Sequence, residues 1–97
     1  MSEPEKAEFL KQALESPDIR KLYANGFANA LGTGDITIVL NRNNVPVGVL
    51  NLSYTAAKTL AVKLMELIQK LEEETGNEIM TIDFLQKVLL EKMRKVE

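Results

Sequence analysis

The stretch that decides the fold is DITIVLNRNNVPVGVLNL, residues 35–52. Its first part, Ile36 to Leu40, is rich in β-branched residues, as strands are. The pair Asn43-Asn44 follows, and asparagine tolerates the left-handed backbone that tight hairpins require. From Val45 to Leu52 the strand pattern resumes, with Pro46 in a place typical of an edge strand or of a strand's first residues. The stretch therefore predicts a β-hairpin.

The preceding segment, Leu22 to Leu31, permits two interpretations. As a strand, it places Tyr23 and Phe27 on one face with two asparagines, and alanines on the other. As a helix, its large side chains fall at four-residue steps. The alternation and the flanking glycines favour the strand, and Gly32-Thr33-Gly34-Asp35 then indicates a turn. We therefore expect a three-stranded antiparallel meander over residues 22–52.

A long amphipathic helix is predicted to follow the strands, over residues 53–75. Ser53 is suited to cap its start, and Gly76 its end. Thr81 is a second N-cap, from which another helix runs to the end of the chain. The apolar stripe of the long helix recurs at three- and four-residue steps. It consists of Ala57, Leu60, Ala61, Leu64, Leu67, Ile68 and Leu71.

The N-terminal segment, residues 1–21, is also predicted to be helical. Ser2 and Glu5 have the spacing of a capping box, and a short amphipathic helix to about Leu14 follows. Ser16-Pro17-Asp18 repeats the start signal and predicts one further turn through Lys21.

The expected fold is therefore a single α+β domain of residues 1–97. Residues 1–21 form an N-terminal helical segment, residues 22–52 the meander, and residues 53–97 two helices. We expect the meander to pack on the long helix, as sheets in this class do. Shorter helices lie at both ends of the chain.

The composition excludes several classes of function. The 97 residues are 45% hydrophobic and 27% charged, and they include no cysteine and no histidine. The chain therefore lacks thiol nucleophiles, cysteine-ligated zinc, and the commonest general base and metal ligand. We expect a non-enzymatic protein without catalytic residues, cofactor or metal. The acidic N-terminus is unlike a secretory signal, and no apolar run reaches the ~20 residues that span a bilayer, so we expect a cytoplasmic protein off the membrane.

Charge is almost missing from the middle of the chain. Of 12 basic and 14 acidic side chains, only Asp35 and Arg42 lie between Leu22 and Leu52. Both faces of the hairpin look apolar, whereas the strands of a sheet with one solvent-exposed face alternate between apolar and polar residues. The two main helices can cover one face of the sheet. The other face can be covered either by the N-terminal helix or by a second copy of the chain. We expect the second copy, since small domains bury a smaller fraction of their surface than large ones and dimerisation is a common remedy. The expected interface residues are Tyr23, Phe27, Ile38, Val39, Val47, Val49 and Leu50.

The favoured function is thus a homodimeric protein–protein interaction module. The alternative is a small nucleic-acid-associated regulator that uses a dimeric sheet or the basic tail of Lys92, Arg94 and Lys95. The formal net charge of -2 argues against nucleic acid as the partner, because such binders carry a basic excess. A third possibility, an enzyme or small-molecule binder, requires a pocket near Tyr23 and Asn25.

Four short stretches resemble a family of short bacterial proteins of unknown function. They are Tyr23-Ala24-Asn25-Gly26-Phe27, Asp35-Ile36-Thr37-Ile38-Val39-Leu40, Val49-Leu50-Asn51-Leu52-Ser53 and Ala57-Lys58-Thr59-Leu60-Ala61. The resemblance implies a strand-strand-strand-helix order over about Tyr23 to Glu74, and so a strand in the ambiguous segment. It implies no activity and no catalytic residue. The chain departs from the family at Tyr54, where a proline often opens the helix.

Overall fold

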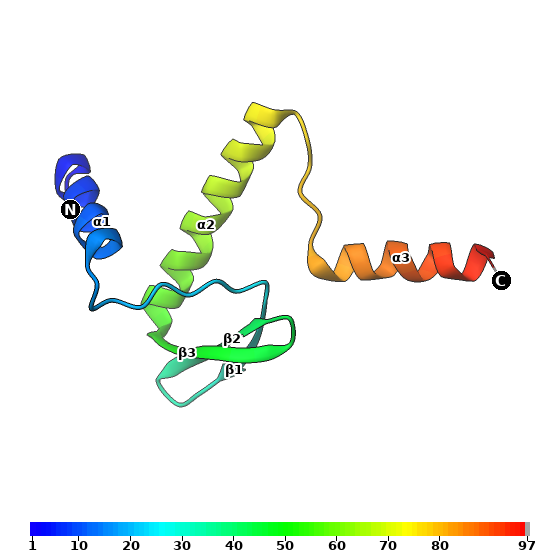
Figure 1. Cartoon of the computed structure of the whole chain (residues 1–97), viewed down its shortest axis with the longest axis horizontal. Helices are drawn as coiled ribbons and strands as arrows, with labels where there is room; N and C mark the ends of the chain where they lie inside the picture. Colours follow the sequence, from blue (N-terminus) through cyan, green and yellow to red (C-terminus); the bar gives the residue numbers. More distant parts are fainter. Residues whose placement is uncertain (97) are drawn as a thin grey trace. The chain divides into compact units, whose positions relative to one another are not determined.

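In the computed structural model, the chain forms helices and one antiparallel sheet (Figure 1). The backbone is described for residues 1–96 and the side chains for residues 1–94. Two units, residues 1–54 and 55–97, make up the chain. The α+β class and the three-stranded antiparallel sheet are confirmed. The elements are α1 (Glu3–Glu15), β1 (Gly26–Leu31), β2 (Asp35–Arg42), β3 (Val45–Ser53), α2 (Tyr54–Thr75) and α3 (Ile82–Val96).

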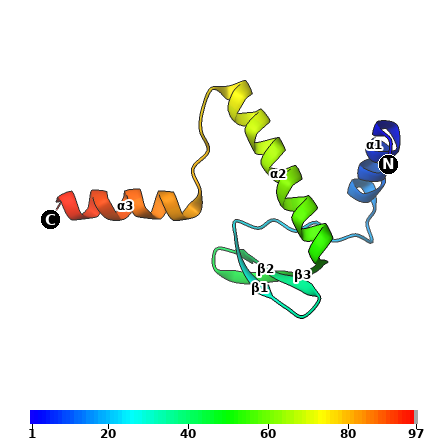
Figure 2. The same cartoon turned by 180° about the vertical axis from the view of Figure 1, so that it is seen from behind.

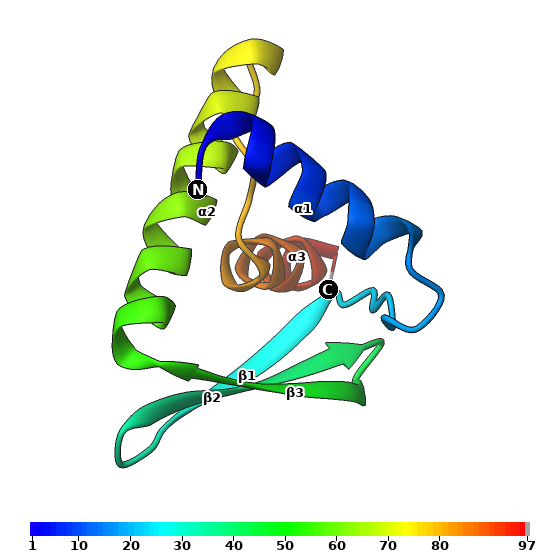
Figure 3. The ribbon, with the colours of Figure 1, turned by 90° about the vertical axis from the view of Figure 1, so that its left-hand side faces the viewer.

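The sheet has the order β1-β2-β3, and its strands and turns can be followed in Figure 3. Asn43 and Asn44 form the turn between β2 and β3 with positive φ angles of 51° and 68°. Two successive left-handed residues are the signature of the tight hairpin turn that matches strand twist. The predicted hairpin is therefore confirmed. Pro46 is the second residue of the edge strand β3, where its missing N–H removes no central ladder bond.

β1 begins at Gly26, four residues later than the predicted segment. The residue before it, Asn25, is held both by the β2–β3 turn and by the end of β2. Its side-chain Nδ2 donates to Asn43 Oδ1 at 2.8 Å, and its Oδ1 accepts from the Asn43 backbone N–H at 2.9 Å. Its backbone N–H donates to the Asn41 carbonyl at 3.0 Å. This pair of asparagines ties the entry of β1 to the β2–β3 turn.

The cap predicted for the N-terminal helix is present. Ser2 Oγ accepts a hydrogen bond from the Glu5 backbone N–H at 3.3 Å, and the Ser2 hydroxyl donates to Glu5 Oε1 at 3.0 Å. These bonds satisfy one of the free N–H groups at the start of α1.

The further helical turn predicted through Lys21 is wrong. Ser16, directly after α1, is extended, with φ -72° and ψ 126°. Pro17 clashes with a helical conformation of the residue before it, so the helix ends there. Ser16 Oγ accepts from the Asp18 N–H at 3.3 Å, which closes a single turn. The chain then continues without regular structure to β1 (Figure 2).

In the second unit, the predicted caps at Gly76 and Thr81 are confirmed. Gly76 has a φ of 69° and donates to the Glu72 carbonyl at 2.9 Å. Thr81 Oγ1 accepts from the Phe84 N–H at 3.2 Å at the start of α3. The Glu72 carboxylate accepts from the Ile79 N–H at 2.8 Å, which gives an acid at a helix C-terminus a local structural role.

No side chain in the part of the chain with described burial is buried. Within residues 1–54, the strands contact one another but α1 contacts none of them, and α2 and α3 make no element contact within their unit. β2 comes nearest to a core, because most of its residues are half-buried between two neighbours. The packing of the meander on the long helix stays a prediction.

Candidate interaction surface

The pairing register gathers the large apolar side chains on one face of the sheet. Ile38 of β2 lies opposite Leu50 of β3, and Leu40 lies opposite Phe27 of β1. Residues directly opposite in a ladder share a face, and every second residue along a strand joins them. We call this the apolar face. It consists of Phe27, Leu31, Ile36, Ile38, Leu40, Leu50 and Leu52, with Asn29 as its polar member.

The opposite face is mixed in character. Val39 and Val49 lie opposite each other there, and next to them Thr37 Oγ1 donates to Asn51 Oδ1 at 2.9 Å. β1 adds only alanine methyl groups. The sequence pattern made both faces look apolar, but the register shows that the two differ. We call this second surface the mixed face.

The predicted interface residues divide between these surfaces. Three of them, Phe27, Ile38 and Leu50, share the apolar face, whereas Val39 and Val49 pair on the mixed face. Val47 lies where the β2–β3 register shifts, and Tyr23 precedes β1. The apolar-face residues absent from the prediction are Leu31, Ile36, Leu40 and Leu52. Their two-residue spacing was visible in the sequence, but the cross-strand register was not.

Gly48 makes room on the apolar face for the segment before β1. It pairs with Leu40, and a Cβ on it would lie 2.9 Å from Leu22 Cδ1. Real Cβ atoms essentially never come so close, so Leu22 occupies the space that a side chain here would fill. Beyond Gly48 the register shifts and Asn41 pairs with Pro46. This register shift is a β-bulge. The bulge and the contact of Leu22 with Gly48 thus place residues 20–25 beside the end of β2.

The turn between β1 and β2 is closed by the first residue of α2. The Tyr54 hydroxyl accepts from the Gly34 N–H at 2.7 Å and donates to the Gly32 carbonyl. Gly34 has a φ of 112°, and a Cβ on Gly32 would lie 2.6 Å from Asp35 Oδ1. The Gly32–Asp35 stretch therefore serves as a strand-connecting turn, as its sequence predicts.

A hollow of about 350 Å³ lies where residues 20–23 meet the end of β2. Its three cations are Arg20, Lys21 and Arg42, and Arg42 Cζ lies 6.0 Å from the centre of the Tyr23 ring. That distance is at the limit of a cation–π contact. Lys21 Nζ also donates to the Ser16 carbonyl. We call this the cationic hollow. Its lining is completed by Leu22, Pro46 and Val47.

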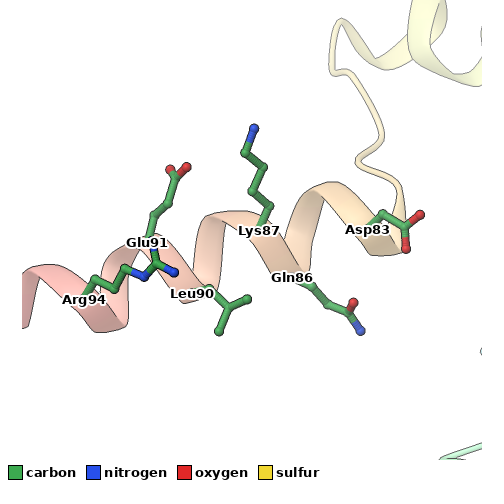
Figure 4. A pocket seen from close by; sticks show the side chains of 6 residues that line it. All are labelled: Asp83, Gln86, Lys87, Leu90, Glu91 and Arg94. Atoms are coloured by element: carbon green, nitrogen blue, oxygen red, sulfur yellow. The ribbon is translucent and has the colours of Figure 1, made fainter.

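A second hollow lies on α3, and its polar side chains do not point toward a common centre (Figure 4). It is lined along the helix surface by acids and bases in alternation (Figure 4): Asp83, Gln86, Lys87, Leu90, Glu91 and Arg94. Lys92 and Arg94 of the predicted basic tail lie on this helix, whereas the Lys95 side chain lies outside the described part. Among described residues, no group of three or more acids is placed to hold a metal ion. In the same part of the chain, every helix is too short or too polar to cross a bilayer.

The chain has no match among family models, curated proteins or solved structures, so its resemblance to a bacterial family stays a prediction.

Proposed function

We propose that this chain is a non-enzymatic, homodimeric protein–protein interaction module whose apolar sheet face is covered by a second copy. The observation that carries the proposal is that neither unit by itself buries a side chain among the residues with described burial. Folded domains owe most of their stability to apolar burial. A sheet with one largely apolar face and no core therefore requires a cover.

The apolar face has the character of an obligate interface. It carries no formal charge, and Leu31 at its edge is 82% exposed. Charged residues are depleted at the centre of interfaces, which resemble a domain core cut in half. The exposed stripe of α2, with Leu60, Leu64 and Leu67, supplies a second apolar surface of the same kind. We propose that the sheet packs on the long helix within this dimer. We place the dimer in the cytoplasm and assign it no cofactor.

The test is the mass in solution. Light scattering coupled to size exclusion, at about 1 to 100 μM, should give twice the 10.9 kDa of one chain, with dissociation on dilution only at the lowest concentrations. Thermal unfolding should then move to higher temperature as the concentration rises. A cooperatively folded monomer at the highest concentration would contradict the proposal.

A further inference from the structure

We propose that the cationic hollow binds single-stranded nucleic acid. One phosphate would lie among Arg20, Lys21 and Arg42, and one base would stack against Tyr23. This inference stands on the first unit alone and does not depend on the proposed dimer.

The charges of the hollow are unbalanced. It is lined by three cations, and no carboxylate is among its described lining residues. The one ion pair in the part of the chain with described side chains joins Lys63 and Glu66, at 3.5 Å. None of the three cations is therefore neutralised by a neighbouring acid in that part. Their positive field is free to attract an anion.

The overall net charge does not describe this part of the surface. Asp18 stands two residues before Arg20, but it forms no ion pair with the described side chains and does not line the hollow. Asp35 is the only acid between Leu22 and Leu52, and it lies at the other end of β2 from Arg42. Seven residues of strand separate them by about 23 Å, at ~3.3 Å per residue. At physiological ionic strength the screening length is about 8 Å. Asp35 therefore does little to weaken the field at the hollow.

The donors suit a phosphate diester. Arg20 and Arg42 each present a planar fork that matches two phosphate oxygens, and Lys21 adds a point charge. Arg42 Cζ lies over the Tyr23 ring, so the cation and the ring are already side by side before a ligand binds. Orientation before binding lowers the entropy lost when the ligand arrives.

The aromatic ring favours a single strand over a duplex. Tyr23 is 67% exposed beside the three cations. Single-strand sites combine a cationic groove with aromatic rings on which unpaired bases stack. A duplex keeps its base faces covered and offers only phosphates. The volume of about 350 Å³ lies at the lower end of the range for small-ligand sites, which is suitable for one nucleotide.

The experiment is fluorescence anisotropy with the full chain and a labelled thymidine oligonucleotide of about 12 residues, compared with a duplex of equal length. We expect the single strand to bind more tightly. Affinity should fall as salt rises, with a slope of about -0.7 per neutralised phosphate. The triple variant Arg20→Gln, Lys21→Gln, Arg42→Gln should lose at least about tenfold in affinity and show a flatter salt dependence.

A matched control separates the site from general charge. The variant Lys58→Gln, Lys70→Gln, Lys87→Gln changes the net charge by the same amount on the other unit and should stay within about twofold of the parent. Tyr23→Leu should weaken binding at least about fivefold, whereas Tyr23→Phe keeps the ring and should bind as the parent does. Far-ultraviolet circular dichroism of each variant checks that the fold persists.

Three results would overturn the proposal. One is equal affinity of the two triple variants. Another is loss of binding in Lys92→Gln, Arg94→Gln, which would move the site to α3. The third is complete displacement of the strand by inorganic phosphate at an equal phosphate concentration, because a strand held by stacking as well as by charge must compete better than a free anion.

Discussion

The backbone N–H of Gly34 donates a 2.7 Å hydrogen bond to the hydroxyl of Tyr54, so a helix-opening side chain holds the β1–β2 turn. The same hydroxyl donates to the Gly32 carbonyl. Within the turn the Gly34 N–H also donates to the Gly32 carbonyl at 3.1 Å. Tyr54 therefore adds, from 20 residues away in sequence, two hydrogen bonds to a turn whose glycines have no side chains to pack.

We expect Tyr54→Phe to destabilise the chain by about 1 kcal/mol, because the two hydrogen bonds from the Tyr54 hydroxyl to the turn backbone are lost while the ring remains. For a domain of this size, that change lowers Tm by about 4–8 °C. Differential scanning calorimetry measures it. Tyr23→Phe is the matched control, since the Tyr23 hydroxyl makes no hydrogen bond among described residues. Equal effects of the two substitutions would remove the role assigned to Tyr54.

Gly34→Ala should destabilise the chain by about 1 kcal/mol, because a φ of 112° is one that side chains rarely adopt. Gly26→Ala is the control, because a Cβ there would lie 3.9 Å from Asn41 Cβ, an ordinary contact. It should be neutral or slightly stabilising. Urea unfolding of both variants gives the comparison. A neutral Gly34→Ala would mean that the turn adapts without strain.

The Asn25–Asn43 pair is expected to be energetically coupled. Asn25→Ala should cost about 1–2 kcal/mol, since it leaves the Asn43 N–H without its partner. Asn43→Gly keeps the left-handed backbone and removes only the side chain. In a double-mutant cycle, the sum of the losses in unfolding free energy of the two single variants should exceed the loss of the double variant by at least about 0.5 kcal/mol. Strict additivity would show that the contact contributes nothing.

Two exposed positions distinguish the faces of the sheet. Leu31 on the apolar face and Val49 on the mixed face are 82% and 59% exposed, so an aspartate at either costs the isolated chain little. Leu31→Asp should weaken the dimer at least about tenfold, because it would bury an unpaired charge in the interface. Val49→Asp should stay within about threefold of the parent. Sedimentation equilibrium measures both, and the reverse ranking would place the interface on the mixed face.

Features set by short-range chemistry were predictable from the sequence. The turn at Asn43 and Asn44 needs two left-handed residues, and asparagine is suited to both. The caps at Gly76 and Thr81 likewise depend only on neighbouring backbone groups. At Ser16-Pro17 the prediction of a further helical turn was wrong, because a serine followed by proline occurs both at the start of a helix and directly after the end of one. The restriction that Pro17 places on Ser16 prevailed there.

Features set by register were not predictable. Alternation alone identified the strands but not the pairing that places Ile38 beside Leu50 and Val39 beside Val49. The cationic hollow was missed because Tyr23 and Arg42 are far apart in sequence. They meet only where the bulge and Gly48 admit Leu22. The sequence names a pocket near Tyr23 and Asn25 only as what a small-molecule binder would require, and in the structure Asn25 binds the β2–β3 turn instead.

The two borders of the sheet are unequal. β3 is blunted by Pro46 and by the bulge opposite Asn41, which hinder the addition of another strand. β1 has neither device: Gly26–Leu31 carries no charge and no proline, and no strand lies beyond it in the described chain. Misassembly at high concentration should therefore begin with β1 of one copy pairing with β1 of another, and a lysine introduced at Ala28 or Ala30 should suppress it.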